Sequence, residues 1–269
     1  MGIDRWVCLN HKDDKETAVK TREVRTIDDA RQIVRERELD YVKVGLFDID
    51  GVMRGKYMQR DKFLSALDEG FGFCDVILGW DSNDQLYDNV SVTGWHTGYG
   101  DAKVRIIPES CRELPLEERS LLFLAEFAPP TESVCPRGLL RRVLRHGKEL
   151  GFNATAACEF EFFLFEETPH SAREKNFRNL KNISPGPFGY SMLRNSVFSE
   201  FYEDLLQLSV EMDFPLEGLH TETGPGVLEG AICHSDALAA ADDGVLGHQL
   251  GPGGGRGVDP FQTDAELAE

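Results

Sequence analysis

Residues 158–165 read Cys-Glu-Phe-Glu-Phe-Phe-Leu-Phe, and in an extended strand these side chains point alternately to the two faces of a sheet. The alternation places Glu159 and Glu161 on one face, about 7 Å apart, and leaves mostly aromatic residues on the other. We therefore predict a strand over residues 153–166 that packs its aromatic face on a core. Two like charges this close disfavour folding unless a cation lies between them. The pattern favours a metal site over the alternative, a solvated edge strand with incidental acids.

A second acidic segment runs from His220 to Glu229 and reads His-Thr-Glu-Thr-Gly-Pro-Gly-Val-Leu-Glu. Its Gly-Pro-Gly turn joins two predicted strands, residues 215–223 and 227–233, and so brings Glu222 near Glu229 across a hairpin. The two segments together offer four carboxylates and one imidazole on neighbouring strands. Carboxylate oxygens in this number are typical of Mg²⁺ or Mn²⁺ sites rather than zinc sites. Each feature alone also has a plainer reading: a simple turn, and a structural histidine at a strand end.

Composition and charge narrow the class of protein. The chain has 269 residues, 41% hydrophobic and 28% charged, which is ordinary for a folded globular protein. Its 29 basic and 47 acidic residues give a net charge of −18, which argues against a nucleic-acid partner. No apolar run reaches the roughly 18–20 residues of a membrane span, and no signal-peptide segment is seen. We expect a cytoplasmic protein with no membrane partner, whose six scattered cysteines are reduced thiols.

The order of predicted elements indicates an α+β fold in two parts. Residues 1–25 are polar and predict a flexible arm, and residues 26–128 predict a compact α+β unit. Within that unit we expect a helix capped by Thr26, a hairpin turning at Asp50-Gly51 and a helix over residues 61–69.

Two prolines after Ala128 mark a boundary, and residues 131–243 form the second predicted unit. We expect helices there over residues 139–150, 196–212 and 236–242. Residues 244–269 are Gly-rich and predict a disordered tail, which we interpret as the product of a frameshift, a splicing difference or a truncated gene.

The two acidic segments resemble the glutamine synthetase family, in particular its γ-glutamyl-amine (glutamyl-polyamine) ligases. The first is similar to the family's E-x-E-F-F-L-F strand, and the second to its H-x-E-x-x-P-G-x-x-E segment. Residues 48–56, Asp-Ile-Asp-Gly-Val-Met-Arg-Gly-Lys, resemble the opening hairpin of the family's β-grasp domain. The resemblance extends over residues 41–243. It implies a β-grasp-like N-terminal domain followed by an incomplete catalytic domain of sheet and helices.

The resemblance also implies roles for individual residues. Glu161, Glu222 and Glu229 would hold one divalent ion, and Glu159 would bind a second. His220 would lie near the transferring phosphate. Asp81 and Ser82 are similar to a loop that reaches the active site of a neighbouring subunit and helps to deprotonate the amine, which implies a homo-oligomer.

The activity implied is an ATP-dependent ligase of nitrogen metabolism. ATP would phosphorylate the γ-carboxylate of glutamate, and ammonia or an amine would then displace phosphate. The family's remaining strands, with further metal ligands and phosphate-binding arginines, have no counterpart here, so we expect weak or no catalysis. The alternative is a non-catalytic structural or regulatory member of the family. A third reading is a cation-binding α+β domain of unrelated role.

Overall fold

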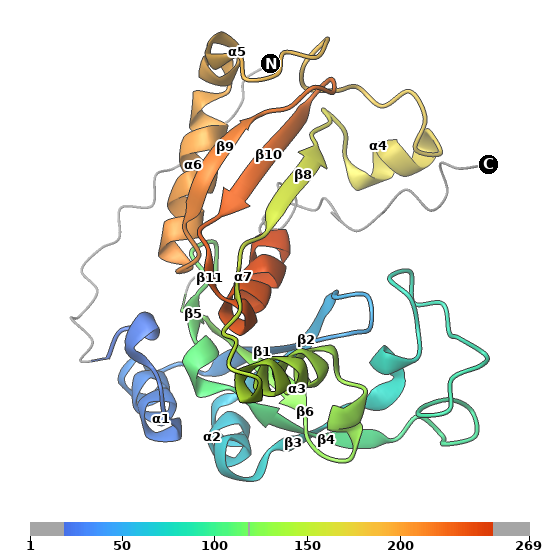
Figure 1. Ribbon diagram of the computed structural model, residues 1–269, viewed down its shortest axis with the longest axis vertical. Coiled ribbons are helices and arrows are strands. Elements are labelled where there is room, and N and C mark those ends of the chain that lie inside the picture. The colour runs from blue at the N-terminus through green and yellow to red at the C-terminus, as the bar shows by residue number, and fades with distance from the viewer. Residues whose placement is uncertain (1–18, 118, 250–269) are drawn as a thin grey trace.

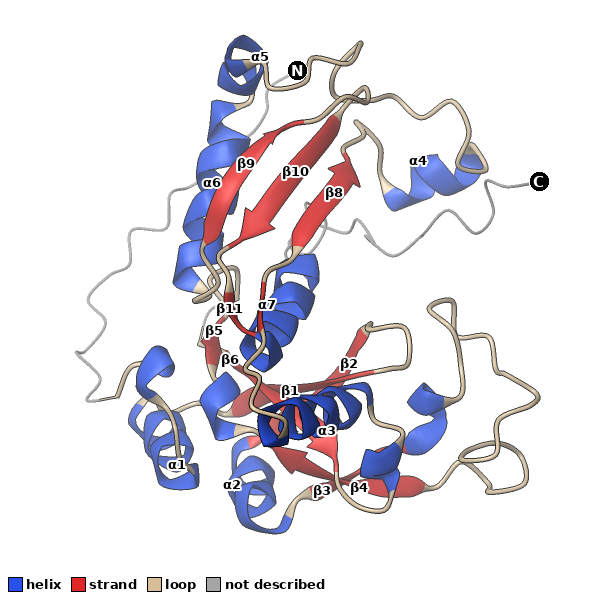
Figure 2. Ribbon diagram, viewed as in Figure 1, coloured by secondary structure: helices blue, strands red, loops and turns tan. Residues whose placement is uncertain are grey.

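The computed structural model describes residues 19–117 and 119–249, which form an α+β fold with one main sheet in each half of the chain (Figure 1, Figure 2). The expected α+β class is confirmed. The predicted tail beyond Gln249 lies outside the described residues, as does most of the predicted N-terminal arm.

The first sheet has six strands in the order β2-β1-β6-β4-β3, with the short β5 paired to β6. β1 and β6 are parallel, and the other pairs are antiparallel. The hairpin predicted at Asp50-Gly51 is confirmed, because β1 and β2 pair over their whole length. The strands are β1 (Tyr41–Phe47), β2 (Met53–Gln59), β3 (Phe71–Cys74), β4 (Asp101–Ile106), β5 (Arg112–Glu113) and β6 (Leu121–Phe127).

Two helices accompany this sheet, α1 (Ile27–Glu36) and α2 (Arg60–Glu69). Thr26 caps α1 as predicted: its hydroxyl accepts from the Asp29 N–H at 3.2 Å, and the Asp29 carboxylate accepts from the Thr26 N–H at 2.9 Å. The predicted arm is wrong at its inner end. Val24 is fully buried in the core, and residues 21–23 form a short 3-10 helix. Removing the Val24 side chain from water stabilises this segment by more than the conformational entropy that its ordering costs.

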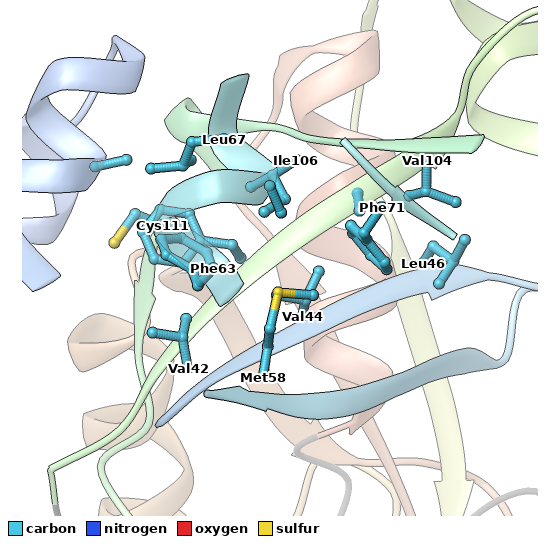
Figure 3. Close-up of a cluster of buried hydrophobic side chains, with 14 of the residues drawn as sticks. Val42, Val44, Leu46, Met58, Phe63, Leu67, Phe71, Val104, Ile106 and Cys111 are labelled. Atoms are coloured by element: carbon cyan, nitrogen blue, oxygen red, sulfur yellow. The ribbon is translucent and has the colours of Figure 1, made fainter. Parts of the chain in front are cut away.

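The first core lies between these helices and one face of the sheet. Val42, Val44 and Leu46 alternate along β1, and they pack with residues such as Phe63 of α2 (Figure 3). All seven residues of β6 are buried, so both faces of this central strand are covered. Odd-numbered residues of β6, such as Phe123, enter this core, and even-numbered ones face the opposite side of the sheet.

A second core joins the two halves of the chain. From the first sheet it takes apolar residues on the face opposite α2, and from the second half it takes residues near the acidic sheet. Its members are Phe47, Ile107, Leu122, Leu124, Met212, Phe214, Ile232 and Leu246. The two units predicted from sequence therefore share buried apolar surface.

The second half contains a three-stranded antiparallel sheet in the order β8-β10-β9, which carries both acidic segments. A separate pair of short strands is formed by β7, which precedes this sheet in the sequence, and β11, which follows it. The elements are α3 (Pro136–Glu149), β7 (Thr155–Ala156), β8 (Glu159–Phe163), α4 (Pro169–Glu174), α5 (Met192–Val197), α6 (Ser199–Glu211), β9 (Leu216–Thr221), β10 (Val227–Ile232), β11 (Ser235–Asp236) and α7 (Ala237–Gln249).

The single strand predicted over residues 153–166 is wrong. The chain forms β7, leaves the ladder at residues 157–158 and resumes as β8. The physical reason is that the two pieces have different partners: β7 pairs with β11, whereas β8 pairs with β10. Side-chain alternation cannot reveal this change of partner.

The last helix is also longer than predicted. We expected it to end at Asp242 and a disordered tail to start at Gly244, but α7 continues to Gln249 and Leu246 is fully buried. Gly244 and Gly247 permit close packing rather than ending the helix. A Cβ at Gly244 would lie 2.8 Å from the Cys158 sulfur, and one at Gly247 would lie 3.1 Å from Ile232 Cδ1.

A buried ion network holds α7 against the first half. Glu126 of β6 is 1% exposed and accepts from Arg137 of α3 at 2.8 Å and from Arg141 at 2.6 Å; Arg105 also pairs with it. The Arg137 guanidinium binds the Asp242 carboxylate of α7 through two hydrogen bonds of 2.9 Å. One arginine thus connects β6, α3 and α7. The pairing was not predicted from the sequence.

We predict that Arg137→Met lowers the free energy of unfolding by about 3 kcal/mol, because it removes a cation from two buried carboxylates. The matched control is Arg31→Met, which removes a surface pair with Asp28 and Asp68 and should cost less than about 1 kcal/mol. Urea denaturation measures both. Equal losses for the two variants would contradict a special role for the buried network.

The glycine packing of α7 predicts opposite effects for the same substitution at two helical sites. Gly147→Ala in α3 should stabilise by up to about 1 kcal/mol, because nothing lies within 4 Å of the added Cβ and alanine favours helix. Gly244→Ala should destabilise by about 1 kcal/mol, because the contact with Cys158 outweighs that gain. Adding Cys158→Ala to Gly244→Ala should restore stability in thermal melts; a loss that persists would mean that the contact is not the cause.

Candidate metal centre

Three side chains form a row across the acidic sheet. Glu229 lies on the central strand β10, directly opposite Glu161 of β8 and directly opposite His220 of β9. Residues directly opposite one another in an antiparallel pair project from the same face. The register therefore brings together residues that are far apart in the sequence, as the two segments predicted.

Glu222 joins this row from the turn at the end of β9. Its backbone N–H donates to the Val227 carbonyl at 2.9 Å, which keeps the hairpin closed beyond the last strand residue. His220 Nε2 is 3.2 Å from Glu222 Oε1 and 3.9 Å from Glu229 Oε2. One donor atom from each of the three residues can be chosen so that all lie within 4.8 Å of one another. The predicted approach of Glu222 and Glu229 across the Gly-Pro-Gly turn is confirmed.

Tyr190 is a member of this cluster that the sequence did not reveal. Its ring stacks on the His220 imidazole, with centroids 4.7 Å apart and planes 15° apart. Its backbone N–H donates to the Thr221 carbonyl at 2.8 Å, which fixes the preceding loop to β9. Tyr190 comes from an irregular segment rich in Gly and Pro, and no periodic pattern marks such a residue.

The pKa values in the cluster reflect its negative charge. The Tyr190 hydroxyl donates to Glu222, and this hydrogen bond, with the Thr223 N–H and His220, lowers the pKa of Glu222 below its usual value. The same bond and the nearby charges of Glu222, Glu229 and Glu161 raise the pKa of Tyr190. The charges of three carboxylates therefore all favour the protonated form of the tyrosine hydroxyl.

The two remaining carboxylates on β8 are more exposed. Glu161 and Glu159 are open to solvent, and Glu159 lies opposite Ala231, one step further from His220. Phe163, on the same face, is 57% exposed and stacks on Phe165. On this chain the acidic face of β8 is open.

The opposite face of the sheet is apolar and packed. Leu228 and Ile232 of β10 are buried, and Phe160 of β8 contacts the second core. Helix α6 packs along β9, and α7 packs at the ends of β8 and β10, near Phe160 and Ile232 (Figure 1). The backbone under the cluster is fixed by packing that does not involve the acidic groups.

Asp81 and Ser82 lie elsewhere, in the loop between β3 and β4. The Asp81 carboxylate accepts from the Asn83 and Gln85 N–H groups, both at 2.9 Å, and the Ser82 N–H donates to Asp50 at 2.8 Å. Within one chain, this loop lies against the β1–β2 turn rather than at the acidic row. Their predicted action on a neighbouring subunit stays a prediction.

The donor set fits a divalent cation. Of the residues that the structure describes, no lysine or arginine nitrogen lies within 4.0 Å of the carboxylates of Glu159, Glu161, Glu222 or Glu229. Among these four, only Glu222 and Glu229 have an ion-pair partner, which is His220. Carboxylates gathered without a matching cation favour binding of a metal ion. The roles of Glu161, Glu222 and Glu229 at one ion and Glu159 at another stay predictions.

Comparison with known proteins decides the family. Residues 133–250 match the catalytic domain of glutamine synthetase. Type-1 glutamine synthetase 2 of Dictyostelium discoideum is 46% identical over 209 residues, which are 77% of this chain and 40% of that protein. The chain belongs to the glutamine synthetase family. The family resemblance of the two acidic segments is thus confirmed.

Other glutamine synthetase relatives agree. Glutamate–isopropylamine ligase of a Pseudomonas species is 32% identical over 224 residues, 80% of this chain and 48% of that protein. The solved structure of GmaS in complex with ADP superposes with a TM-score of 0.63 at 18% identity, covering 81% of this chain and 47% of that one, and so shows the same fold. The chain spans about half the length of the relatives it matches. None of the helices between residues 19 and 249 that the structure describes has the length and apolarity to cross a bilayer.

We predict that Tyr190→Phe raises the pKa of Glu222 toward its usual value, because the hydroxyl that stabilises the carboxylate is lost. A carboxyl group with a lowered pKa contributes stability above its usual pKa, and that contribution is lost as the pH falls through the lowered value. Carbon-13 NMR of labelled glutamates in metal-free protein measures the shift. Tyr57→Phe, which removes a hydroxyl that donates to Glu117, is the control and should leave Glu222 unchanged.

Proposed function

We propose that the chain is an ATP-dependent ligase of the glutamine synthetase type, which joins the γ-carboxylate of glutamate to ammonia or an amine. The observation that carries the proposal is the acidic row of Glu161, Glu229 and His220, completed by Glu222, in a chain of the glutamine synthetase family. A relative named glutamate–isopropylamine ligase supports the proposal that an amine is a substrate. A fold neighbour solved with ADP supports the proposal that a nucleotide binds.

The reaction has two steps. A γ-carboxylate oxygen of glutamate attacks the γ-phosphorus of ATP, which gives an acyl phosphate and releases ADP. The nitrogen of ammonia or the amine then attacks the acyl carbon, the bond to phosphate breaks, and the nitrogen loses a proton to a base. The first step brings together two anionic groups, so the protein must compensate their charge. The second step releases a proton from nitrogen, so the protein must supply a base.

Divalent ions such as Mg²⁺ or Mn²⁺ supply charge neutralisation and polarise the phosphoryl oxygens when bound. Glu161, Glu222 and Glu229 would hold one ion, and Glu159 would contribute to a second. His220, which lies next to Glu222 and Glu229, would donate a hydrogen bond to a phosphate oxygen at the same face. Tyr190 keeps the Glu222 carboxylate and the His220 ring in position.

Asp81 and Ser82 act in this proposal on the site of a neighbouring subunit within a homo-oligomer. Hydrogen bonds to Asn83 and Gln85 hold the Asp81 carboxylate, and Arg54 bridges the buried Asp48 at 2.8 Å to Asp84 at 2.6 Å, so the loop has a fixed shape. A carboxylate presented in this way is suited to accept the proton of the amine.

We also propose that the first half is the β-grasp-like domain that the opening hairpin predicts. The hairpin β1–β2, the return of β6 parallel to β1 and the packing of α2 on the sheet support this assignment. The predicted limits, residues 26–128 and 131–243, separate it from the part that carries the acidic row.

A second candidate is a non-catalytic structural or regulatory member of the family. The observation in its favour is that Glu159, the residue proposed for the second ion, is exposed and lies opposite Ala231, outside the cluster of His220, Glu222 and Glu229. This reading keeps the metal site but removes the need for nucleotide binding.

Calorimetry on the full chain with Mg²⁺ or Mn²⁺, followed by ATP, tests the proposal. We expect metal to bind and ATP to bind only when metal is present. Glu229→Gln should weaken metal binding by roughly tenfold or more, which corresponds to about 1.4 kcal/mol. Glu217→Gln, on an exposed residue of β9 at the register shift with β10 and away from the acidic row, is the matched control. Metal binding without ATP binding would favour the non-catalytic reading, and no metal binding would contradict both.

A further inference from the structure

The turn between β9 and β10, residues 223–226, is attached to a segment that lies 43 residues earlier in the sequence. The Asn182 side-chain nitrogen donates to the Pro225 carbonyl of this turn at 2.8 Å. Glu222 immediately precedes the turn, and its N–H closes the hairpin by donating to the Val227 carbonyl. We propose that Asn182 is a positioning residue for the acidic cluster, which acts by fixing the turn and with it Glu222. This inference rests on the proposed function.

The segment that carries Asn182 is paired with the chain just beyond β8. An isolated antiparallel bridge joins Asn182 to Phe165. Backbone hydrogen bonds of 3.1 Å and 2.7 Å between residues 181–183 and residues 164–166 flank this bridge. The backbone of Asn182 is therefore fixed relative to β8, the strand that carries Glu161. A hydrogen bond from this position holds the turn of β9 and β10 in place relative to their neighbour β8.

The turn fits closely against this contact. Gly226 has a φ of 74°, in the left-handed region that favours glycine, and its carbonyl accepts from the Leu164 N–H at 2.9 Å. A Cβ at Gly226 would lie 3.0 Å from the Leu164 carbonyl oxygen and 3.3 Å from the Asn182 Cβ. Pro225 offers only its carbonyl oxygen to the side chain of Asn182. The position therefore requires a donor, which an aspartate at neutral pH cannot supply.

The loop that begins at Asn182 reaches the cluster again at its other end. The Tyr190 N–H donates to the Thr221 carbonyl at 2.8 Å, and the Thr221 hydroxyl donates to the Phe188 carbonyl at 2.8 Å. The loop is thus attached to the hairpin once at the turn and once at β9, on either side of Glu222. Loosening the turn should therefore also loosen the attachment of Tyr190, whose ring stacks on an imidazole of the cluster.

The competing explanation is that the Asn182 bond, which is partly exposed to water, only closes a loop. Hydrogen bonds of this kind contribute little to the stability of a whole fold. Removing a partner that holds a metal-binding group in place, however, weakens metal binding by about 10- to 100-fold. The two explanations therefore agree that global stability changes little, and they differ in what they predict for metal affinity.

Asn182→Asp is the most informative variant, because it keeps the size of the side chain, removes the donor and adds a negative charge. Added negative charge alone would strengthen the binding of a dication, whereas a displaced turn weakens it, so the two effects have opposite signs. The matched control is Asn153→Asp, the same change at an exposed residue before β7. Calorimetry with Mn²⁺ measures affinity. Hydrogen exchange in the metal-free full chain measures opening at the Glu222 and Tyr190 amides.

We expect Asn182→Asp to weaken Mn²⁺ binding about tenfold and to speed exchange of both amides about tenfold, while Asn153→Asp changes neither by more than about twofold. The melting temperature should stay close to that of the unmodified chain, which shows that the variant is folded. Asn182→Ala, which removes the donor without adding charge, should change affinity and exchange in the same directions.

Three results would overturn the inference: equal or tighter Mn²⁺ binding in Asn182→Asp, unchanged exchange at the two amides, or an equal loss of affinity in Asn153→Asp. If the unmodified chain binds no Mn²⁺, the proposed function fails. The exchange rates then decide by themselves whether Asn182 fixes the turn and the loop that ends at Tyr190.

Discussion

The position of the acidic sheet depends on how the buried carboxylate of Glu126 is neutralised. A charge inside a protein is tolerated only when partners at hydrogen-bond distance replace its water. Arg137 does this for Glu126 and, with the same guanidinium, for Asp242 of α7. The close contacts of Gly244 and Gly247 and the ion pair of Asp242 act on different sides of α7, and together they fix its rotation and the placement of the strands next to it.

The two faces of the second sheet have different roles. One face is apolar and packs in the second core, so its burial stabilises the fold. The other face gathers like charges, which the sequence led us to regard as unfavourable without a cation. The structure explains why they are tolerated: Glu159 and Glu161 are exposed, and water screens them. The charges on this face are therefore separable from folding, and the chain can keep its architecture while the acidic face is altered.

The sequence predicted what depends on local periodicity. Alternation along residues 158–165 placed Glu161 correctly, and the Gly-Pro-Gly turn correctly joined Glu222 to Glu229. Contacts between distant segments were not predictable in this way. The break between β7 and β8 arises from pairing with different strands, and Tyr190 comes from a loop with no pattern. The composition at Gly244 resembles a helix terminus, although packing against Cys158 makes glycine the residue that fits.

Helix α7 uses three of its sides at the same time. Ala240, Gly244 and Gly247, spaced four and three residues apart, give a smooth side next to the strands; Asp242 carries the ion pair, and Leu246 fills the core. Each residue added to an α-helix turns everything after it by about 100°. A single residue inserted between positions 240 and 242 would therefore turn Asp242, Gly244 and Leu246 together by about 100° relative to Ala240. Side chains of α7 can therefore be substituted more readily than the length of the helix can change between residues 240 and 242.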